Sequence, residues 1–139
     1  ELNPISFKGN LEAACREERY RFFAQLSQQM EFQAILTGHH QDDQAETIFK
    51  RVLEGAHWSR WIGLRPESWI LSVRVLRPLL NVSKSEIQQM LSQEGLAGFD
   101  DPTNRHLRFL RARLRESLFP RLNEEFGKQV QKSFIEIGE

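Results

Sequence analysis

A short apolar run, a polar loop and a helical pattern follow one another between residues 32 and 55, and this order constrains the fold most. Residues 32–36 are predominantly apolar and Gly38 follows them, which favours a buried strand. From Asp42 onward, apolar side chains recur at helical spacing until Gly55, a good helix terminator. Open α/β sheets bind ligands beyond the carboxyl ends of their strands. The loop between strand and helix is therefore predicted to carry a functional site.

That loop and the helix start are rich in ionisable groups: residues 39–46 include two histidines and three carboxylates. Asp43 and Glu46 are three positions apart and share one helix face. Such a pair could hold an ammonium group, a magnesium ion or a protonatable nucleophile. The alternative is structural, because the helix dipole favours acidic residues in the first turn and Asp42 could be a cap. The spacing does not match a zinc site.

The rest of the chain alternates helices and strands. Apolar spacing predicts a helix over residues 11–30, a loop or short helical turn over 55–68 and a second strand over 69–76. Ser83 and Glu86 form a capping box that begins a helix ending near Gln93. An arginine-rich helix is expected from about residue 106, interrupted near Pro120 and resumed from Asn123. This order predicts an α/β fold with a parallel sheet and flanking helices, followed by C-terminal helices. Two strands are too few for these helices, so the sheet is expected to be incomplete.

Composition limits the class of protein but does not indicate a function. The 139 residues carry no net charge and no apolar stretch of membrane-spanning length, and a cytoplasmic protein is expected. The one cysteine, Cys15, cannot form an internal disulfide or a cysteine cluster and is expected to be a small buried side chain. Between residues 105 and 121 there are six arginines and one acid, Glu116. This stretch is either a phosphate-attracting patch or a solvated helix face.

A second group of polar residues precedes those arginines. Residues 100–104, Asp-Asp-Pro-Thr-Asn, are turn formers that could simply cap a helix. Arg111 and Arg115, four positions apart, are expected to project from the same helix face, and their guanidinium groups suit phosphate or carboxylate.

Four motifs in order give the chain a resemblance to the tRNA(Ile)-lysidine synthases, bacterial members of the ATP-pyrophosphatase or PP-loop group. They are Gly-His-His-Gln-Asp-Asp-Gln-Ala-Glu-Thr at 38–47 with Arg51, Gly55 and Gly63-Leu64; the helix at 12–20; Arg-Pro-Leu-Leu at 77–80; and residues 100–104 with 110–115. The resemblance implies a Rossmann-like fold of the adenine nucleotide alpha hydrolase type. Residues 1–104 would be the C-terminal part of the PP-loop ATPase domain, and 105–139 an arginine-rich helical extension.

The resemblance also implies a reaction. ATP, with Mg2+, would adenylate C2 of the wobble cytidine in an isoleucine tRNA, and the ε-amine of L-lysine would then displace AMP to form lysidine. His39, Asp43 and Glu46 would be the catalytic residues. Three arginines would bind lysine, phosphate or tRNA: Arg16, Arg111 and Arg115. No residue is predicted to be a metal ligand.

Two departures from the family pattern qualify this interpretation. The Ser-Gly-Gly-x-Asp-Ser loop that holds ATP in the family does not occur in these residues, and Arg111-Ala112 replaces the usual Arg-Asn pair. The chain alone is therefore expected to bind ATP poorly and not to turn over. Two alternatives stay open: a tRNA 2-thiolation enzyme of the same group, and a non-catalytic RNA-binding remnant.

Overall fold

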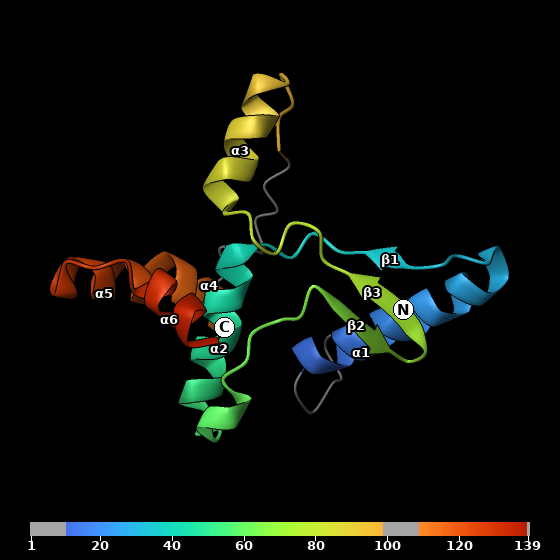
Figure 1. Cartoon of the computed structure of the whole chain (residues 1–139), viewed down its shortest axis with the longest axis horizontal. Coiled ribbons are helices and arrows are strands. Elements are labelled where there is room, and N and C mark those ends of the chain that lie inside the picture. The colour runs from blue at the N-terminus through green and yellow to red at the C-terminus, as the bar shows by residue number, and fades with distance from the viewer. Residues whose placement is uncertain (1–10, 99–108, 139) are drawn as a thin grey trace. The chain divides into compact units, whose positions relative to one another are not determined.

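A computed structural model describes residues 11–98 and 109–138, which fall into two compact units. The described residues up to Thr37, together with Arg65–Pro78, form a sheet unit, and Gly38–Leu64 together with the described residues from Leu79 form a helical unit. The sheet unit contains one helix and three strands (Figure 1): α1 (Leu11–Met30), β1 (Ile35–Leu36), β2 (Glu67–Ile70) and β3 (Val73–Leu76). The helical unit contains α2 (Gln41–Leu53), a 3-10 turn η1 (Trp58–Arg60), α3 (Lys84–Gln93), α4 (Leu110–Arg113), a π-helical turn η3 (Leu114–Leu118), α5 (Phe119–Phe126) and α6 (Val130–Gly138).

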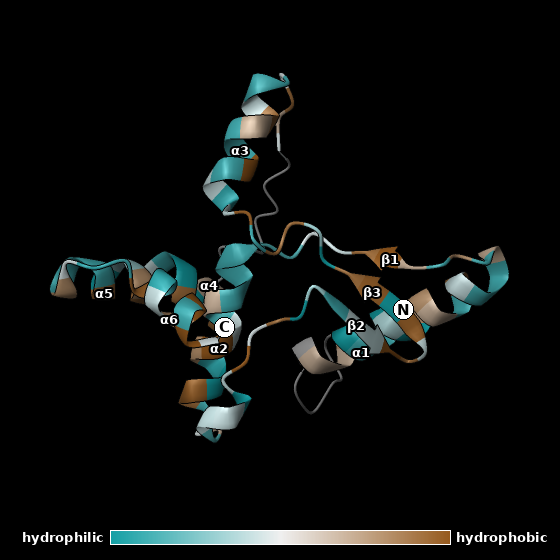
Figure 2. Ribbon diagram, in the orientation of Figure 1, coloured by the Kyte–Doolittle hydropathy of each residue, from teal (hydrophilic) through white to brown (hydrophobic). Residues whose placement is uncertain are grey.

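The strands of the sheet unit are ordered β1-β3-β2. β1 pairs with β3 in parallel, with Ile35 opposite Val75, while β2 pairs with β3 antiparallel, with Glu67 opposite Leu76. Alternate β3 residues, Val73 and Val75, are buried with Tyr20 of α1, and hydropathy colouring shows apolar residues along these strands (Figure 2). The sheet therefore rests on α1 through one apolar face.

The structure corrects the predicted second strand. Residues 69–76 do not form one strand; β2 and β3 form a hairpin whose turn residues, Leu71 and Ser72, have φ values of 49° and 64°. Two consecutive left-handed residues match the twist of paired strands, but Asn and Gly are the usual occupants. The sheet is consequently mixed, although the β1–β3 pair is parallel as expected. The strand predicted over residues 32–36 is reduced to Ile35–Leu36.

Within the helical unit, α2 packs against α6 and the segment that contains α4, η3 and α5. Ala45, Leu114 and Phe119 are buried together, and the Phe49 ring meets Phe119 and Phe134 edge-on at 5.5 and 4.9 Å between centroids. The same segment brings Arg111 and Arg115 to Asp43 and Glu46 at the amino end of α2. The core thereby fixes the direction in which the first turn of α2 faces.

The expected helix break at Pro120 is wrong. The chain stays helical from Leu110 to Phe126, with Pro120 at the start of α5 and the wider π-helical turn η3 directly before it. Proline lacks the amide proton that an α-helix needs, and its ring crowds the preceding turn. A π-helical turn is a known way to accommodate such a local mismatch. The helix ends instead at Gly127, which has φ 60°.

Other local predictions are confirmed. α1 spans Leu11–Met30, and the Ser83 amide and hydroxyl exchange hydrogen bonds with Glu86 at 2.8 and 3.2 Å to begin α3. The motif at residues 100–104 and Arg108 lie outside the described residues, as does the predicted boundary between 104 and 105. None of the described helices is long and apolar enough to cross a membrane.

The hairpin turn yields a stability prediction. A non-glycine residue in the left-handed region costs roughly 1–2 kcal/mol, so Ser72→Gly should raise the free energy of unfolding by about 1 kcal/mol. Chemical denaturation measures the change. Ser92→Gly is the matched control: that serine is exposed within α3, where glycine should instead destabilise. An equal decrease for both variants would contradict the strained turn.

Candidate active site at the amino end of α2

Two carboxylates and two guanidinium groups meet beside the first turns of α2. Asp43 and Glu46 are buried, with only 8% and 2% of their surfaces exposed. Arg111 of α4 and Arg115 of η3 face both of them, so the expectation that these arginines share one face is confirmed. The four formal charges cancel, which makes the burial of two acids tolerable.

The two arginines contact the carboxylates at different distances. Arg115 donates through Nε and Nη2 to Glu46 Oε1 at 3.0 and 2.6 Å. Arg111 lies farther away, with Nη1 3.8 Å from Asp43 Oδ1 and Nε 4.0 Å from Glu46 Oε2. Arg115 is thus the anchor of the group, because its hydrogen bonds to Glu46 are shorter than the contacts of Arg111 with the two acids.

Asp43 also serves the backbone of the helix. His40 is the residue that caps α2, and its amide donates to Asp43 Oδ2 at 3.0 Å. The His40 Nε2 atom lies 3.6 Å from the same oxygen. The capping alternative raised by the sequence therefore applies to Asp43 and not to Asp42. It accounts for Oδ2 only, because the Oδ1 atom faces Arg111 and Arg115 at 3.8 and 3.9 Å.

Burial and charge act in opposite directions on the central ion pair. Burial raises the pKa of the Glu46 carboxyl above its ordinary value of 4.5, and the opposing charge and hydrogen bonds of Arg115 do not cancel that effect. Burial alone would lower the pKa of Arg115, but the charge and hydrogen bond of Glu46 raise it. Glu46 is thus easier to protonate than an ordinary glutamate, while Arg115 stays charged.

Several buried polar atoms in the same stretch have no hydrogen-bond partner among the residues that the structure describes. They are Nδ1 of His40, Oε2 of Glu46 and Oγ1 of Thr47. Most buried polar atoms in folded proteins are paired, since an unmet group costs free energy. Three such atoms within eight residues are typical of a place where another molecule supplies hydrogen bonds.

The other two predicted site residues, His39 and Arg16, have no described ion pair with this group. His39 is half-buried in the loop that leads into α2. Arg16 belongs to α1 in the sheet unit, where its guanidinium lies 5.0 Å from the Tyr20 ring centroid. The structure brings together four of the six predicted residues, namely Asp43, Glu46, Arg111 and Arg115.

Gln44 is a positioning residue that sequence reasoning missed. Its side-chain amide donates to the Leu64 carbonyl at 2.9 Å and accepts from the Leu64 amide. A Cβ at Gly63 would collide with this side chain, so the glycine leaves room for the clamp. The Gly63-Leu64 pair in the motif was the available signal, because a glycine before a polar contact marks close approach.

A polar groove begins at the amino end of α2, within the helical unit; Asp43 and Glu46 are not part of its lining. Its volume is about 770 Å³ and its lining includes Asp42, the neighbour of Asp43, together with Gln41, Asn81, Ser83, Gln129 and Lys132. Ligand sites commonly enclose about 300–1,000 Å³. The groove is large enough for a nucleoside, and its amides and hydroxyls offer both donors and acceptors.

Three similar known proteins carry the same name. Residues 3–122 match the PP-loop domain family. The chain is 46% identical over 129 residues to a tRNA(Ile)-lysidine synthase of Protochlamydia amoebophila, covering 93% of the chain and 28% of that protein. It is 41% identical to the protein of that name from Chlamydia muridarum, over 99% of the chain and 42% of the relative, and 39% identical to that from Chlamydia pneumoniae, over 94% and 41%. The chain thus spans less than half of each relative's length.

Removing the anchor should destabilise the protein through the charge left behind. Arg115→Met is expected to lower the free energy of unfolding by about 3 kcal/mol at pH 8, because Glu46 would stay buried without its close partner. Arg113→Met, in the same helical segment but exposed, is the matched control and should change little. Denaturant titration measures the free energy of unfolding of both variants. Equal decreases would contradict the anchoring role of Arg115.

The raised pKa of Glu46 gives a pH prediction. Its contribution to stability is fully present below pH 4.5, the ordinary value, and falls as the pH rises through the higher pKa of the folded state. Glu46→Gln removes this titration. The free energy of unfolding of the unmodified protein minus that of the variant should therefore decrease as the pH rises above 4.5. If this difference increased over the same range, the charge of Arg115 would outweigh burial and the pKa of Glu46 would be lowered instead.

Proposed function

The chain belongs to the PP-loop domain family, and we propose that it takes part in ligating L-lysine to C2 of the wobble cytidine of an isoleucine tRNA with ATP. The observation that carries the proposal is the buried Asp43–Glu46 pair facing Arg111 and Arg115. The names of the similar relatives supply the substrate. A cytoplasmic location belongs to the same proposal, because tRNA and ATP are available there.

The proposed reaction has two steps that balance. The O2 atom of the cytidine attacks the α-phosphorus of ATP, forming an O–P bond while the bond to pyrophosphate breaks. The lysine Nε then attacks C2, the C2–O bond breaks, and AMP leaves with that oxygen. The ammonium must lose protons before or during the second step, since its ordinary pKa is near 10.4. The protein has to bind a cation and accept a proton.

Asp43 is proposed to bind the lysine ammonium. Among the described residues, its Oδ1 atom has ion pairs of 3.8 and 3.9 Å, so a closer cation can join without breaking a short hydrogen bond to these residues. Its other oxygen is held by the His40 amide, which fixes the orientation of the carboxylate. Asp43 therefore offers a positioned acceptor at the amino end of α2.

Glu46 is proposed to take up a proton as the amine forms. Burial raises its pKa, which makes it a stronger base than an ordinary glutamate, and among the described residues Oε2 has no hydrogen-bond partner. Arg111 faces that oxygen through Nε at 4.0 Å, whereas the hydrogen bonds of Arg115 go to Oε1. A phosphate that attracted Arg111 would uncover Glu46 while Arg115 kept it in place.

The arginines and His39 complete the proposed site. Arg111, with 37% of its side chain exposed, would meet the phosphate of the adenylate, and Arg115 would preserve the charge balance. Arg16 and His39 keep their predicted roles in binding phosphate and in orienting lysine or the base. We also keep the proposal that residues 105–139 form an arginine-rich helical extension of the catalytic domain.

Magnesium is proposed to arrive with ATP. Among the described residues, no group of three or more histidine, cysteine or acidic side chains could hold a metal ion. The acids nearest the proposed chemistry, Asp43 and Glu46, already face arginines. Magnesium commonly keeps several waters and binds through substrate phosphates, which fits this arrangement.

The overall reaction has a direct test. A full-length protein that contains this chain together with the Ser-Gly-Gly-x-Asp-Ser loop, incubated with ATP, labelled L-lysine and an isoleucine tRNA transcript, should transfer label to the tRNA and release pyrophosphate and AMP. Replacing the wobble cytidine by uridine is the control and should abolish labelling. Pyrophosphate release without labelled tRNA under any lysine concentration would contradict lysine as the nucleophile.

The division between Asp43 and its neighbour gives a sharper prediction. Asp43→Asn preserves a hydrogen-bond acceptor for the His40 amide but removes the charge, so kcat/KM for lysine should fall about 100-fold. Asp42→Asn, one position away and outside the ion pairs of the site, should change it less than threefold. Steady-state kinetics at varied lysine measures both. Equal effects would mean that helix electrostatics, rather than ammonium binding, explains the loss.

A further inference from the structure

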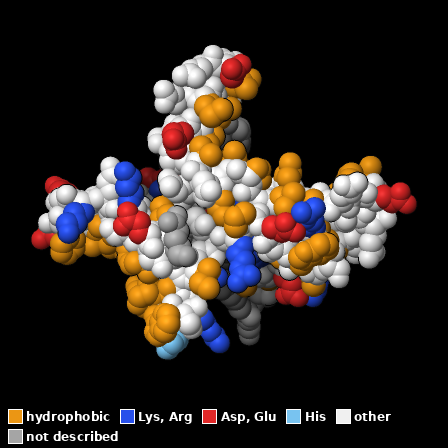
Figure 3. Space-filling view, in the orientation of Figure 1, with side chains coloured by type: hydrophobic (Ala, Val, Ile, Leu, Met, Phe, Trp, Pro, Cys, Tyr) orange, Lys and Arg blue, Asp and Glu red, His pale blue; other side chains and the backbone are white. Residues whose placement is uncertain are grey.

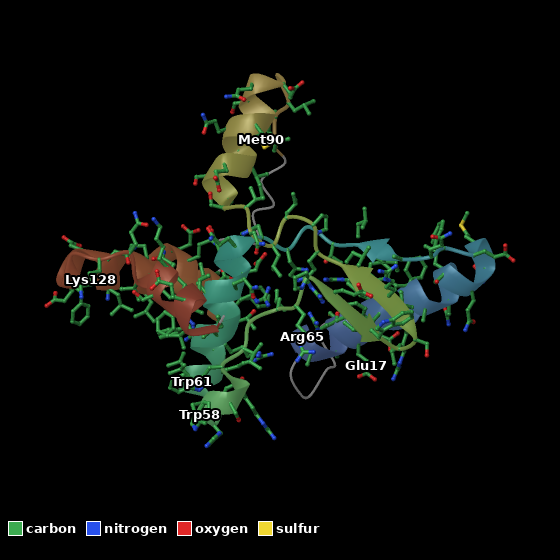
Figure 4. All side chains as sticks on the ribbon, in the orientation of Figure 1. Glu17, Trp58, Trp61, Arg65, Met90 and Lys128 are labelled. Carbon is green, nitrogen blue, oxygen red and sulfur yellow. The ribbon has the colours of Figure 1, made fainter. Side chains whose placement is uncertain are left out.

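An aromatic side chain is held in solvent at the carboxyl end of α2. Trp58 is 72% exposed, and it lies in η1 near Trp61 (Figure 4). Most exposed apolar residues need no explanation, but an exposed tryptophan leaves an unusually large apolar surface in contact with water. Figure 3 shows apolar side chains gathered in this region beside a histidine and basic side chains.

The backbone around Trp58 is fixed by hydrogen bonds. The Trp61 indole donates to the Ala56 carbonyl at 2.7 Å, and the Arg60 amide donates to the His57 carbonyl at 2.8 Å. Arg51 of α2 donates to the Arg60 carbonyl at 3.1 Å, which ties the turn to the helix. Trp58 therefore stands on a braced turn, and little ordering entropy would be lost when a ligand stacks on it.

The charge around the ring is positive. Arg60 is exposed, Arg51 is half-buried beneath the turn, and the His57 ring lies 5.3 Å from that of Trp58. The single acid within residues 50–62 is Glu54, which already faces Lys50 at 3.8 Å. Among the described ion pairs none joins Arg51 or Arg60 to an acid, and Glu136 of α6, whose Gly138 lies against Trp61, is the acid that approaches this turn from another element.

We propose that the surface formed by Arg51, His57, Trp58 and Arg60, the Trp58 surface, binds unpaired nucleotides of the RNA substrate. Trp58 stacks on a base, and Arg60 meets the adjoining phosphate. Unpaired RNA bases are commonly recognised by stacking on aromatic rings, and cations beside the ring bind the backbone. This inference rests on the proposed tRNA substrate and names a contact for it.

The length of α2 indicates that a ligand in contact with both the acidic pair and the Trp58 surface is a macromolecule. α2 has 13 residues, and at 1.5 Å per residue its two ends are about 20 Å apart. The acidic pair lies at one end and the Trp58 surface follows the other. A free nucleotide cannot reach both, whereas an RNA stem-loop can.

The experiment compares two tryptophans of similar exposure in the intact protein. Trp58→Ala should weaken binding of an isoleucine tRNA transcript about tenfold at fixed salt, and Trp58→Phe should recover most of the affinity. Trp69→Ala is the matched control, because Trp69 is 67% exposed but lies on β2 in the other unit, beside the Glu67–Arg74 ion pair. Fluorescence anisotropy with labelled tRNA gives the dissociation constants.

A second variant tests the phosphate contact. Arg60→Gln should reduce the slope of log affinity against log salt by about one. An unchanged slope together with equal affinities of Trp58→Ala and Trp69→Ala overturns the proposal. Self-association of the unmodified protein that Trp58→Ala abolishes, with tRNA affinity unchanged, overturns it in favour of a protein contact.

Lysidine formation separates this inference from the proposed function. If the protein labels tRNA with lysine and Trp58→Ala leaves the KM for tRNA unchanged, the reaction stands and the Trp58 surface fails. If no labelling occurs but Trp58→Ala still weakens RNA binding while Trp69→Ala does not, the surface stands and the reaction fails.

Discussion

The ion pair between Glu46 and Arg115 is the interaction on which the helical unit and its site both depend. It joins α2 to a segment 69 residues later, through contacts of 2.6 and 3.0 Å. A buried carboxylate is costly without a partner, and Arg115 meets that need from the adjoining helical segment. The apolar contacts of Ala45, Leu114 and Phe119 hold the two segments at the same place. Packing and electrostatics therefore support one geometry.

The neutral balance of this group shapes the chemistry proposed for it. Asp43 and Glu46 carry two negative charges, and Arg111 and Arg115 carry two positive ones. A lysine ammonium alone would add a third cation, and a phosphate alone would add an anion to a balanced site. Binding both would keep the charges of these four side chains in balance. In the proposed reaction, this is the state in which adenylate and amine are present together.

Local signals in the sequence were sufficient for much of this structure. Apolar spacing located α1 and α2, and the Ser83–Glu86 capping box located the start of α3, because each is decided by residues within a few positions. The hairpin was not predictable, since Leu71 and Ser72 lack the glycine or asparagine that marks a left-handed turn. The Asp43 and Glu46 pair could be named from its spacing. Its pairing with Arg115 depends on tertiary packing across 69 positions, so the sequence could indicate the participants but not the contacts.

The two ends of α2 would serve the proposed reaction in different ways. A stacked base on Trp58 makes the same contact before and during the chemical step, so it raises affinity for the RNA without lowering the barrier directly. The acidic pair acts on a charge that changes during the reaction, as the ammonium becomes an amine. Because one helix with a packed core connects the two, a base held at the Trp58 surface restricts where the rest of the RNA can lie. Remote binding of this kind can orient the wobble cytidine, which is how a contact far from the reacting atoms contributes to the rate.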